Sequence, residues 1–356
     1  MGKLVVLCVV VVAFSALIGD RILRLRKRAL ADRLLEQNHL PNCRLIKGLE
    51  YGSEDVTILP NGQAIISTGL KWPGLPSYSD DPGKIFVLDL EDERLKPVEM
   101  RIARGFDIDS FNPHGISIYT DENDDSKNLF VVNHPDGKSQ VEIFQFIEEE
   151  NSIVHLKTVQ HELLHSVNDI VAVGPESFYA TNDHYFSNGV LKQLEMLLLQ
   201  TWCTVVYYSP EEVKVVADAF YSGNGINISP DNKFIYVSDI LDHTVHVLEI
   251  QENNNLTKVK SVAVGSLCDN VEVDPGTGDL WLGCHPNVWK LIMSDPQDPP
   301  GSEVIQIQNI HSEKPIVTQV YADDGGVIQG SSVASPYKGK LLIGSVYQKA
   351  LCCDLK

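Results

Sequence analysis

Apolar and polar residues follow one recurring pattern through most of the chain. A polar residue opens each copy, and an alternating apolar run, a turn rich in Pro, Gly, Asp or Asn, and a second apolar run follow it. Alternation with a period of two between turn residues predicts two antiparallel β-strands per copy. The six copies are Glu54–Gly62 with Ala64–Ser67, His114–Tyr119 with Leu129–Val132, Asn168–Pro175 with Phe178–Ala180, Asn224–Asn232 with Phe234–Val237, Asp269–Pro275 with Leu280–Leu282, and Gln329–Pro336 with Leu341–Ile343.

The spacing of the copies predicts the architecture. Matching positions lie 46 to 61 residues apart, at Asp55, His114, Asn168, Asn224, Asn270 and Ser331. Further β-rich runs complete four strands per copy, at Lys84–Leu90, Val141–Phe146, Val205–Tyr208 and Thr244–Ile250. Repeats of this period predict an all-β fold, a six-bladed β-propeller over residues 41–356, in preference to a β-sandwich with coincidental repeats.

A propeller brings the polar residue that opens each inner strand toward one end of the central axis. These residues are Glu54 and Asp55, His114, Asn168 and Asp169, Asn224, and Asp269 and Asn270. Converging carboxylate and amide oxygens are the ligands that Ca²⁺ takes, whereas zinc prefers fewer nitrogen and sulfur ligands. The doublets could serve two ions at different depths, because successive strand residues point in opposite directions.

The first forty residues have a different composition. Leu4–Gly19 is almost unbroken apolar sequence, and its best small-residue cleavage site, Ala13-Phe14-Ser15, lies inside the apolar run. We therefore expect a retained signal-anchor over residues 1–19. Residues 20–40 predict a basic amphipathic helix that lies at a membrane or lipid surface, or one that docks on the body. The basic cluster Arg21–Arg28 favours a cytoplasmic body, which conflicts with the oxidising compartment that a disulfide would require, so the topology stays open.

Charge and cysteine content narrow the function classes. The net charge is −19, with an excess of four positive charges in residues 1–40, so the remainder is strongly acidic and nucleic-acid binding is not expected. Seven cysteines show no spacing typical of zinc sites. A bridge from Cys43 to Cys352 or Cys353 would close the ring. Asn255 begins a glycosylation sequon in a polar turn, whereas the sequon at Asn227 lies in a strand pattern and is expected to be silent.

Two alternative chemistries lack support in the sequence. His161-Glu162-Leu163-Leu164-His165 matches the helical zinc-protease motif, but a strand pattern begins directly afterwards and leaves no room for a long helix. We interpret this segment as a connector. No G-x-S-x-G motif of a serine hydrolase occurs.

Several segments of the chain resemble sequences of the serum paraoxonase/arylesterase family, in particular its lactonase-type, paraoxonase 2-like branch. The resemblance covers nearly the whole chain, and its strings are Ser53–Asp55, Phe111–Ile116, Val131–Pro135, Val167–Pro175, Thr181–Phe186, Asn224–Pro230, Gly283–Pro286 and Lys340–Gly344. It implies a six-bladed propeller with two axial Ca²⁺ ions, lactonase and arylesterase activity, a retained N-terminal hydrophobic segment, a secretory-pathway location, and attachment to a membrane or lipoprotein surface through residues 1–40. A homo-oligomer is left open.

The resemblance also implies roles for individual residues. His114 would be the general base and His134 its partner. The family's terminal disulfide maps to Cys43 with Cys353, and Cys284 would be its free thiol, while Cys203, Cys268 and Cys352 are additional cysteines. The catalytic Ca²⁺ would be held by Glu54, Asn168, Asn224, Asp269 and Asn270, and the structural Ca²⁺ by Asp55, the carbonyl of Ile116, and Asp169.

Together these features predict a calcium-dependent hydrolase of lactones and aryl esters. Calcium would polarise the carbonyl, and a histidine with a pKa near neutrality would activate water. The rival interpretation is a non-catalytic, membrane-tethered or secreted propeller in which calcium is purely structural. Expected substrate-lining residues are Leu70, Trp72, His184, His285, Leu291, Ile292, Ser332 and Val346.

Overall fold

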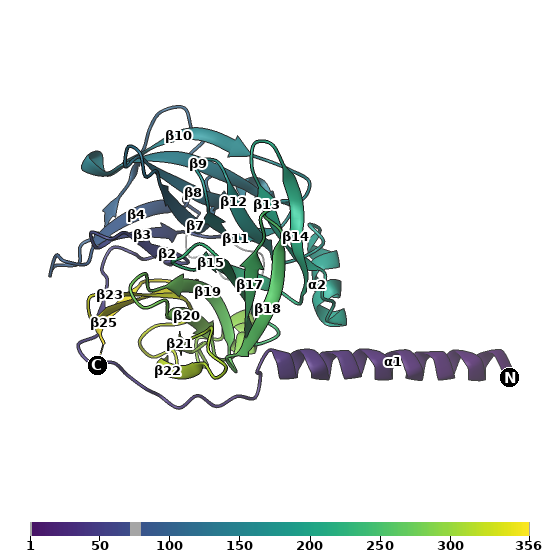
Figure 1. Cartoon of the computed structure of the whole chain (residues 1–356). Helices are drawn as coiled ribbons and strands as arrows, with labels where there is room; N and C mark the ends of the chain where they lie inside the picture. Colours follow the sequence, from purple (N-terminus) through teal and green to yellow (C-terminus); the bar gives the residue numbers. More distant parts are fainter. Residues whose placement is uncertain (1, 72–79, 356) are drawn as a thin grey trace.

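The strands form a ring of six blades, which confirms the predicted fold. The computed structural model describes residues 2–71 and 80–355, and Figure 1 shows the ring with one long helix projecting from it. From the inner to the outer strand, the sheets are β2 (Val56–Ile58), β3 (Gln63–Thr68), β4 (Lys84–Asp89) and β5 (Val98–Glu99); β7 (Pro113–Thr120), β8 (Lys127–Asn133), β9 (Gln140–Ile147), β10 (Ser152–Val159) and β6 (Arg101–Ile102); β11 (Val167–Ala172), β12 (Phe178–Asn182), β13 (Cys203–Tyr208) and β14 (Val213–Phe220); β15 (Gly223–Ile228), β16 (Phe234–Asp239), β17 (Thr244–Ile250) and β18 (Leu256–Ala263); β19 (Leu267–Val273), β20 (Leu280–His285), β21 (Ser302–Gln308) and β22 (Ile316–Asp323); and β23 (Ser331–Tyr337), β24 (Lys340–Ser345), β25 (Leu351–Asp354) and β1 (Arg44–Leu45).

The first strand of each repeat lines the axis, as the repeat pattern predicts. Strands β2, β7, β11, β15, β19 and β23 contact one another in that order, and β23 contacts β2 again, so the inner strands close a ring. Apolar side chains fill the interfaces between neighbouring blades. Between the second and third blades, for example, Val132 and Ile143 pack with Phe178 and Val206. Because successive residues of a strand point to opposite faces, alternate residues of a blade pack against the blade on either side.

The two ends of the chain close the ring together. Strand β1 pairs with β25 in the antiparallel sense, so the last blade takes its outer strand from the N-terminal side of the propeller. The Cys43–Cys353 disulfide joins the same two segments across a sequence separation of 310 residues. This confirms the predicted bridge, while Cys352 is a buried free thiol.

Removing this bridge is expected to lower stability without changing the fold of the blades. Cys43→Ala or Cys353→Ala should reduce the free energy of unfolding by about 2–5 kcal/mol, because the disulfide restricts nearly the whole unfolded chain. Chemical denaturation followed by intrinsic fluorescence measures this loss. Non-reducing peptide mapping that joined Cys43 to Cys352 would contradict the assignment.

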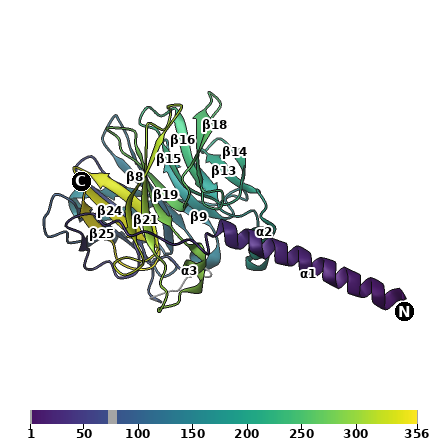
Figure 2. The same cartoon turned by 90° about the horizontal axis from the view of Figure 1, so that it is seen from below.

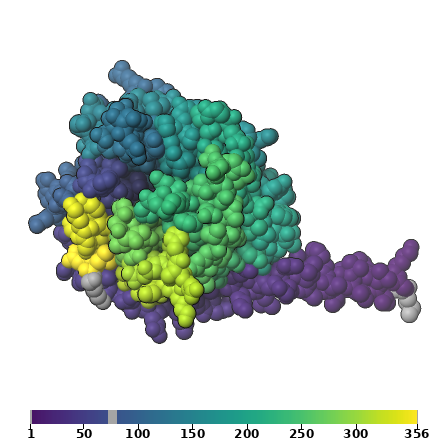
Figure 3. Space-filling model, in the orientation of Figure 1, coloured from purple at the N-terminus to yellow at the C-terminus, as the bar shows by residue number. Residues whose placement is uncertain are grey.

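Among the described residues, three α-helices lie outside the blades: α1 (Gly2–Arg28), α2 (Gly189–Leu198) and α3 (Val288–Met293). Two short 3₁₀ turns, η1 (Pro135–Gly137) and η2 (Glu148–Glu150), accompany them. Helix α1 is continuous across the predicted boundary at residue 19 and ends at Arg28, and residues 33–38 are not helical. None of its residues is buried, and Figure 3 shows it projecting from the body. It is long and apolar enough to cross a membrane, a property that signal sequences share.

Candidate metal and catalytic site

A backbone irregularity recurs at the same place in the inner strands. In β7, β11, β15, β19 and β23 the pairing register shifts across two residues near the start of the strand. The residues inside these irregularities are His114-Gly115, Asn168-Asp169, Asn224-Gly225, Asp269-Asn270 and Ser332-Val333. Bulges re-aim side chains beside functional sites. They place the polar doublets in irregular backbone, where simple strand alternation does not apply.

Glycine at two of these positions lets neighbouring inner strands approach closely. A Cβ atom on Gly115 would lie 2.3 Å from Asp169 Oδ1, and one on Gly225 would lie 2.5 Å from the Cα of Asn270. Both distances are shorter than any real contact, so a side chain would push the polar doublets apart. The close approach of the inner strands at the polar doublets therefore depends on these two glycines.

Buried oxygen atoms without hydrogen-bond partners gather at this end of the axis. Among the described residues, nine buried side-chain nitrogen or oxygen atoms lack a partner, and five of them belong to this site: Glu54 Oε2, Asn168 Oδ1, Asn224 Oδ1, Asn270 Oδ1 and His285 Nδ1. Leaving such groups unpaired costs roughly 1–3 kcal/mol each. The four oxygens come from residues of the predicted catalytic calcium set, and a hard cation would satisfy them together.

Hydrogen bonds between blades hold the other atoms of this set. Asn270 Nδ2 donates to the backbone oxygen and to Oε1 of Glu54, both at 3.0 Å. Ser332 Oγ donates to the Glu54 carbonyl at 2.6 Å. Asp269, the fifth predicted ligand, accepts from His285 Nε2 at 2.9 Å. The Asn270 amide thus turns its donor toward Glu54 while its oxygen has no hydrogen-bond partner, which is the orientation a cation site needs.

A second group of carboxylates lies beside a cavity of about 120 Å³ on the axis. Asp55 accepts from the backbone nitrogens of Val56 and Ile116, each at 2.8 Å. Asp169 accepts in the same way from Ile170 at 2.7 Å and Ile226 at 2.8 Å. These two residues and Ile116 are the predicted structural calcium set, and all three line the cavity.

One acidic residue of this cavity, Glu272, is not among the ligands predicted from the sequence. Glu272 of β19 lines it, and burial, reinforced by the charge of Asp55, raises the pKa of Glu272 well above its usual range. The signal was present, because Glu272 is an acidic residue on an inner strand, directly after the Asp269-Asn270 doublet and Val271, and the inner strands line the axis. A third carboxylate strengthens the case for positive charge on the axis.

Without a cation, Asp55 is expected to make stability depend on pH. Burial, reinforced by Glu54, raises the pKa of Asp55 from 3.8 to about 7. A carboxyl group with a raised folded-state pKa stabilises the fold below its unfolded pKa, and this contribution is lost as pH rises through the folded pKa. In chelator, the stability difference between Asp55→Asn and the wild type should therefore move in favour of the variant by up to about 4 kcal/mol between pH 4 and pH 8.

Urea denaturation of both proteins at each pH measures this difference. The two proteins share every other titrating group, so the comparison reports residue 55 together with the effect of its charge on the pKa values of Asp169 and Glu272. Saturating calcium should remove or reverse the trend, since a bound cation favours the ionised carboxylate. A difference that stays constant with pH in chelator would show that Asp55 has an ordinary pKa.

A pair of histidines stands next to the unpaired oxygens. His114 Nδ1 and His134 Nε2 are 3.1 Å apart, and His134 Nδ1 lies 3.2 Å from the carbonyl oxygen of Lys138. His114 Nε2 lies 3.5 Å from Glu54 Oε1. Strand β7 positions the first ring, and the loop after β8 positions the second through a backbone bond from His134 to Asn112 at 3.0 Å.

The surroundings shift the pKa values of the two rings in opposite directions. Burial, reinforced by the charge of His114, lowers the pKa of His134 to about 3, so this ring is neutral at physiological pH. Burial also acts to lower the pKa of His114, but the carboxylates of Glu54, Asp183 and Asp269 together outweigh it and the net shift is upward. A neutral His134 that donates from Nδ1 to Lys138 accepts at Nε2. In its neutral form, His114 would then donate from Nδ1 and carry a lone pair on Nε2.

The predicted substrate-lining residues fall into different surroundings. His285 is buried against Asp269, and His184 lies beside Asp183 at 2.8 Å. Ser332 is buried behind Glu54, and Ile292 is 47% exposed on α3. Leu70 and Val346 are half-buried and Leu291 is buried, whereas Trp72 lies outside the described residues. Their contact with substrate stays a prediction.

Two sequence interpretations are resolved by the local structure. The His161–His165 segment forms a turn, as expected of a connector. The expectation that Cys284 is a free thiol is wrong, because Cys284 forms a second disulfide with Cys268. These two residues are directly opposite on β20 and β19. The free cysteines among the described residues are Cys8, Cys203 and Cys352.

Helices α2 and α3 cover the end of the ring that carries the site. Each follows a strand, β12 or β20, that ends where the unpaired oxygens lie, and Figure 2 shows both near the base of α1. Lys192 of α2 donates to Ser166, and Val288 of α3 donates to the Ala29 carbonyl. Their outward residues are apolar and exposed: Val190, Leu191, Leu194, Ile292 and Met293.

Comparisons with known proteins agree with this site and fold. The arylesterase family model matches residues 35–355. "Serum paraoxonase/arylesterase 2" of Homo sapiens is 60% identical and that of Gallus gallus is 59% identical, each over the whole of both chains. "Serum paraoxonase/lactonase 3" of Homo sapiens is 53% identical, again over the whole of both chains.

Solved structures with little sequence similarity share the architecture. A luciferin-regenerating enzyme matches with a TM-score of 0.53 at 11% identity, covering 89% of this chain and 99% of that chain. A calcium-binding protein, regucalcin, from Agrobacterium tumefaciens matches with a TM-score of 0.50 at 10% identity, covering 86% of this chain and 90% of that chain. At this identity the likeness concerns the fold alone.

Fold and sequence together place the chain among carboxylic-ester hydrolases built on a six-bladed β-propeller. Within that class, it belongs to the serum paraoxonase/arylesterase family, which confirms the predicted resemblance. An apolar N-terminal helix and a terminal disulfide are features of proteins of the secretory pathway.

Proposed function

We propose that the protein is a calcium-dependent hydrolase of lactones and aryl esters in which His114 is the general base. The observation that carries the proposal is a set of four buried side-chain oxygens without hydrogen-bond partners on or beside the inner strands, one of them on Glu54, whose other carboxylate oxygen lies 3.5 Å from His114 Nε2. A non-catalytic scaffold would have no use for a paired histidine at the edge of a cation site. Membership of an esterase family further favours catalysis.

The residues that would hold two calcium ions form two layers on the axis. The catalytic ion would be held by Glu54, Asn168, Asn224, Asp269 and Asn270, and the structural ion by Asp55, Asp169 and the carbonyl of Ile116. The chemistry that a bound calcium ion supplies is polarisation of the ester carbonyl and stabilisation of negative charge on its oxygen. Unpaired amide oxygens and the raised pKa values of Asp55 and Asp169 support this assignment.

The histidine pair would move the proton. His134 holds His114 in the tautomer that leaves Nε2 unprotonated, through the chain of contacts from the Lys138 carbonyl. His114 Nε2 takes a proton from a water molecule, whose oxygen attacks the carbonyl carbon. The protonated ring then returns this proton to the departing alkoxide or phenoxide, so the base is regenerated at the end of each cycle.

Location at a membrane or lipoprotein surface is part of the proposal. Helix α1, which carries basic residues after Gly19, lies beside α2 and α3 (Figure 2), and both of these helices carry exposed apolar residues. An apolar substrate held in a lipid surface would meet the site from this side. The proposal includes a retained leader and a glycan at Asn255, which is exposed.

Hydrolysis of a substrate panel tests the proposal directly. Purified full-length protein in detergent should hydrolyse aliphatic lactones and phenyl acetate, with the rate followed by proton release at constant pH. An alkyl amide of matched size serves as the negative control, because its leaving group needs stronger activation. A protein that bound calcium but hydrolysed no member of the panel would favour the scaffold interpretation.

A further inference from the structure

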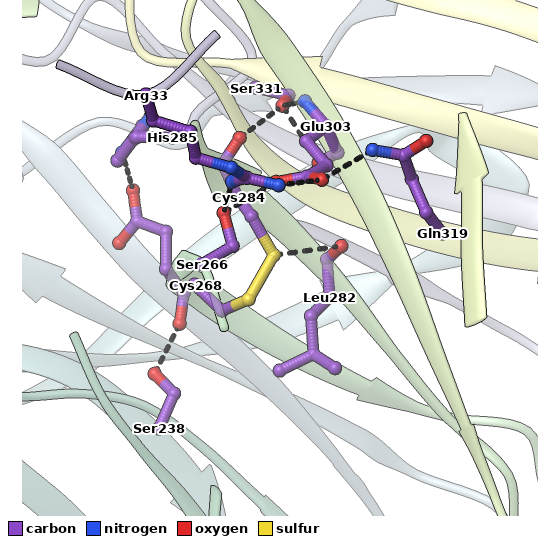
Figure 4. The surroundings of a disulfide bond; sticks show 11 residues. Arg33, Ser238, Ser266, Cys268, Leu282, Cys284, His285, Glu303, Gln319 and Ser331 are labelled. Carbon is purple, nitrogen blue, oxygen red and sulfur yellow. Dashed lines mark hydrogen bonds and ion pairs between the residues drawn. A yellow bond between two sulfur atoms is a disulfide. The ribbon is translucent and has the colours of Figure 1, made fainter. Parts of the chain in front are cut away.

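We infer that the Cys268–Cys284 disulfide is a positioning element of the candidate calcium site, and that its reduction by a small dithiol releases calcium before it unfolds the propeller. The inference rests on the proposed calcium site. Figure 4 shows this disulfide with His285, Ser238 and Ser331 and the surrounding hydrogen bonds. Reduction breaks the S–S bond, forms two cysteine thiols with the protons of the dithiol, and leaves the dithiol as its own disulfide.

The bridge lies in the β19–β20 ladder next to the irregular backbone of two predicted ligands. Cys268 and Cys284 are directly opposite, and the register of β19 with β20 shifts between Cys268 and Val271. Asp269 and Asn270 lie inside this irregularity, where ladder hydrogen bonds do not hold the backbone. The disulfide is therefore a covalent tie at the last regular pair before two predicted ligands.

The residues that follow the two cysteines in sequence are joined by a hydrogen bond. Asp269 follows Cys268, His285 follows Cys284, and the two are joined by a bond of 2.9 Å between Asp269 Oδ2 and His285 Nε2. A displacement between the two strands at the bridge thus acts first on this bond. Asp269 would lose the partner that orients its carboxylate toward the axis.

The bridge is buried, and side chains of the two neighbouring blades form hydrogen bonds to the backbone around it. Ser238 donates to the Asp269 carbonyl at 2.5 Å, and Ser331 donates to the Cys284 carbonyl at 2.9 Å. Both cysteines are buried, with 2% and 0% exposure. Two thiols need more room than one disulfide, and a close-packed interior gives room only by moving its parts. Ser238 and Ser331 hold the carbonyls of Asp269 and Cys284, so we expect the displacement to fall on the Asp269 side chain and on the backbone at Asn270, which neither serine holds.

The bridge contributes modestly to global stability. It closes a loop with a sequence separation of 16 residues within one hairpin, and the strands also pair from Val271 to Val273. Loop closure of this size contributes about 3 kcal/mol, compared with the larger effect of the bridge between the chain ends. Loss of the bridge is therefore expected to appear in metal affinity at conditions where the blades stay folded.

Calcium affinity of a double variant tests the inference. Cys268→Ala/Cys284→Ala should bind calcium about 10–100-fold more weakly than the wild type, the usual effect of removing support behind metal ligands. Isothermal titration measures the dissociation constant, and excess calcium should restore most of the lactonase rate. The matched control is Cys352→Ala, a buried cysteine in the last blade, which should leave calcium affinity unchanged.

The outcomes separate this inference from the proposed function. A wild-type protein that binds no calcium would overturn both. A wild-type protein that binds calcium, with a double variant of equal affinity, would overturn the positioning role alone, as would peptide mapping that finds Cys268 and Cys284 as thiols.

If the double variant does not fold, wild-type protein is titrated with a dithiol while a calcium dye and peptide mapping follow release and reduction. Calcium that stays bound after selective opening of this bridge would contradict the inference.

Discussion

His114→Gln should lower kcat for lactone hydrolysis by about two to four orders of magnitude, the usual contribution of a positioned base. Glutamine can replace the hydrogen bond to His134 but cannot accept a proton from water. The imidazole is not among the proposed calcium ligands, so calcium affinity and the melting temperature should change little. Steady-state kinetics at saturating calcium, together with isothermal titration, measure both properties.

A control for this variant exists within the chain. His161→Gln changes an exposed histidine in the His161–His165 turn and should leave kcat unaffected. Full activity in His114→Gln would move the proton transfer to another group, such as Glu54. Loss of calcium from His114→Gln would instead mean that the ring supports the metal site.

Removal of calcium is the second large effect expected. Exhaustive chelation should reduce lactone and ester hydrolysis to background and should lower the melting temperature by roughly 5–10 °C. Glu54, Asp55, Asp169 and Glu272 converge on the axis, and without a cation their charges repel or must be neutralised by protons. Activity assays and scanning calorimetry after chelation measure these two effects, and elemental analysis measures the calcium that remains in the protein.

Metal selectivity and one ligand variant sharpen this test. Calcium should restore activity, whereas magnesium should restore little, because Mg²⁺ demands a small octahedral shell that keeps several waters. Asn168→Ala removes one unpaired oxygen and should weaken calcium binding, with activity recovered at higher calcium. Activity that survives chelation in protein free of calcium would refute the metal assignment.

The repeat pattern could predict the ring and the polar residues at its end because both depend on local information. Each copy carries its own alternation, its own turn and its own opening residue, so six weak signals support one another. The choice between Cys352 and Cys353 required the orientation of β25. Cys353 packs in the same cluster as Cys43, while Cys352 points to the opposite face of the strand.

Backbone irregularities explain what the sequence could not predict. Beyond the irregularity, Val271 pairs with Leu282, and the same register carried back would place Cys268 opposite His285. The bulge shifts the pairing by one residue and brings Cys268 opposite Cys284 instead. Residue propensities and hydrophobic periodicity do not predict where a bulge shifts the strand register, so the second disulfide was not predictable. The end of α1 at Arg28 is another such case, because the basic residues around it suit both helix and irregular chain.

The closure of the ring by strands from both chain ends has a consequence for biosynthesis. Residues 44–45 leave the ribosome early, but their partner strand, residues 351–354, is made last. The last blade therefore cannot be completed during translation, and the Cys43 thiol must wait, unpaired, until the whole polypeptide has been synthesised. During that interval Cys203, Cys268, Cys284 and Cys43 coexist as potential partners. A nascent chain that loses its final six residues would be left with an open ring and an unpaired cysteine, features that protein quality control detects.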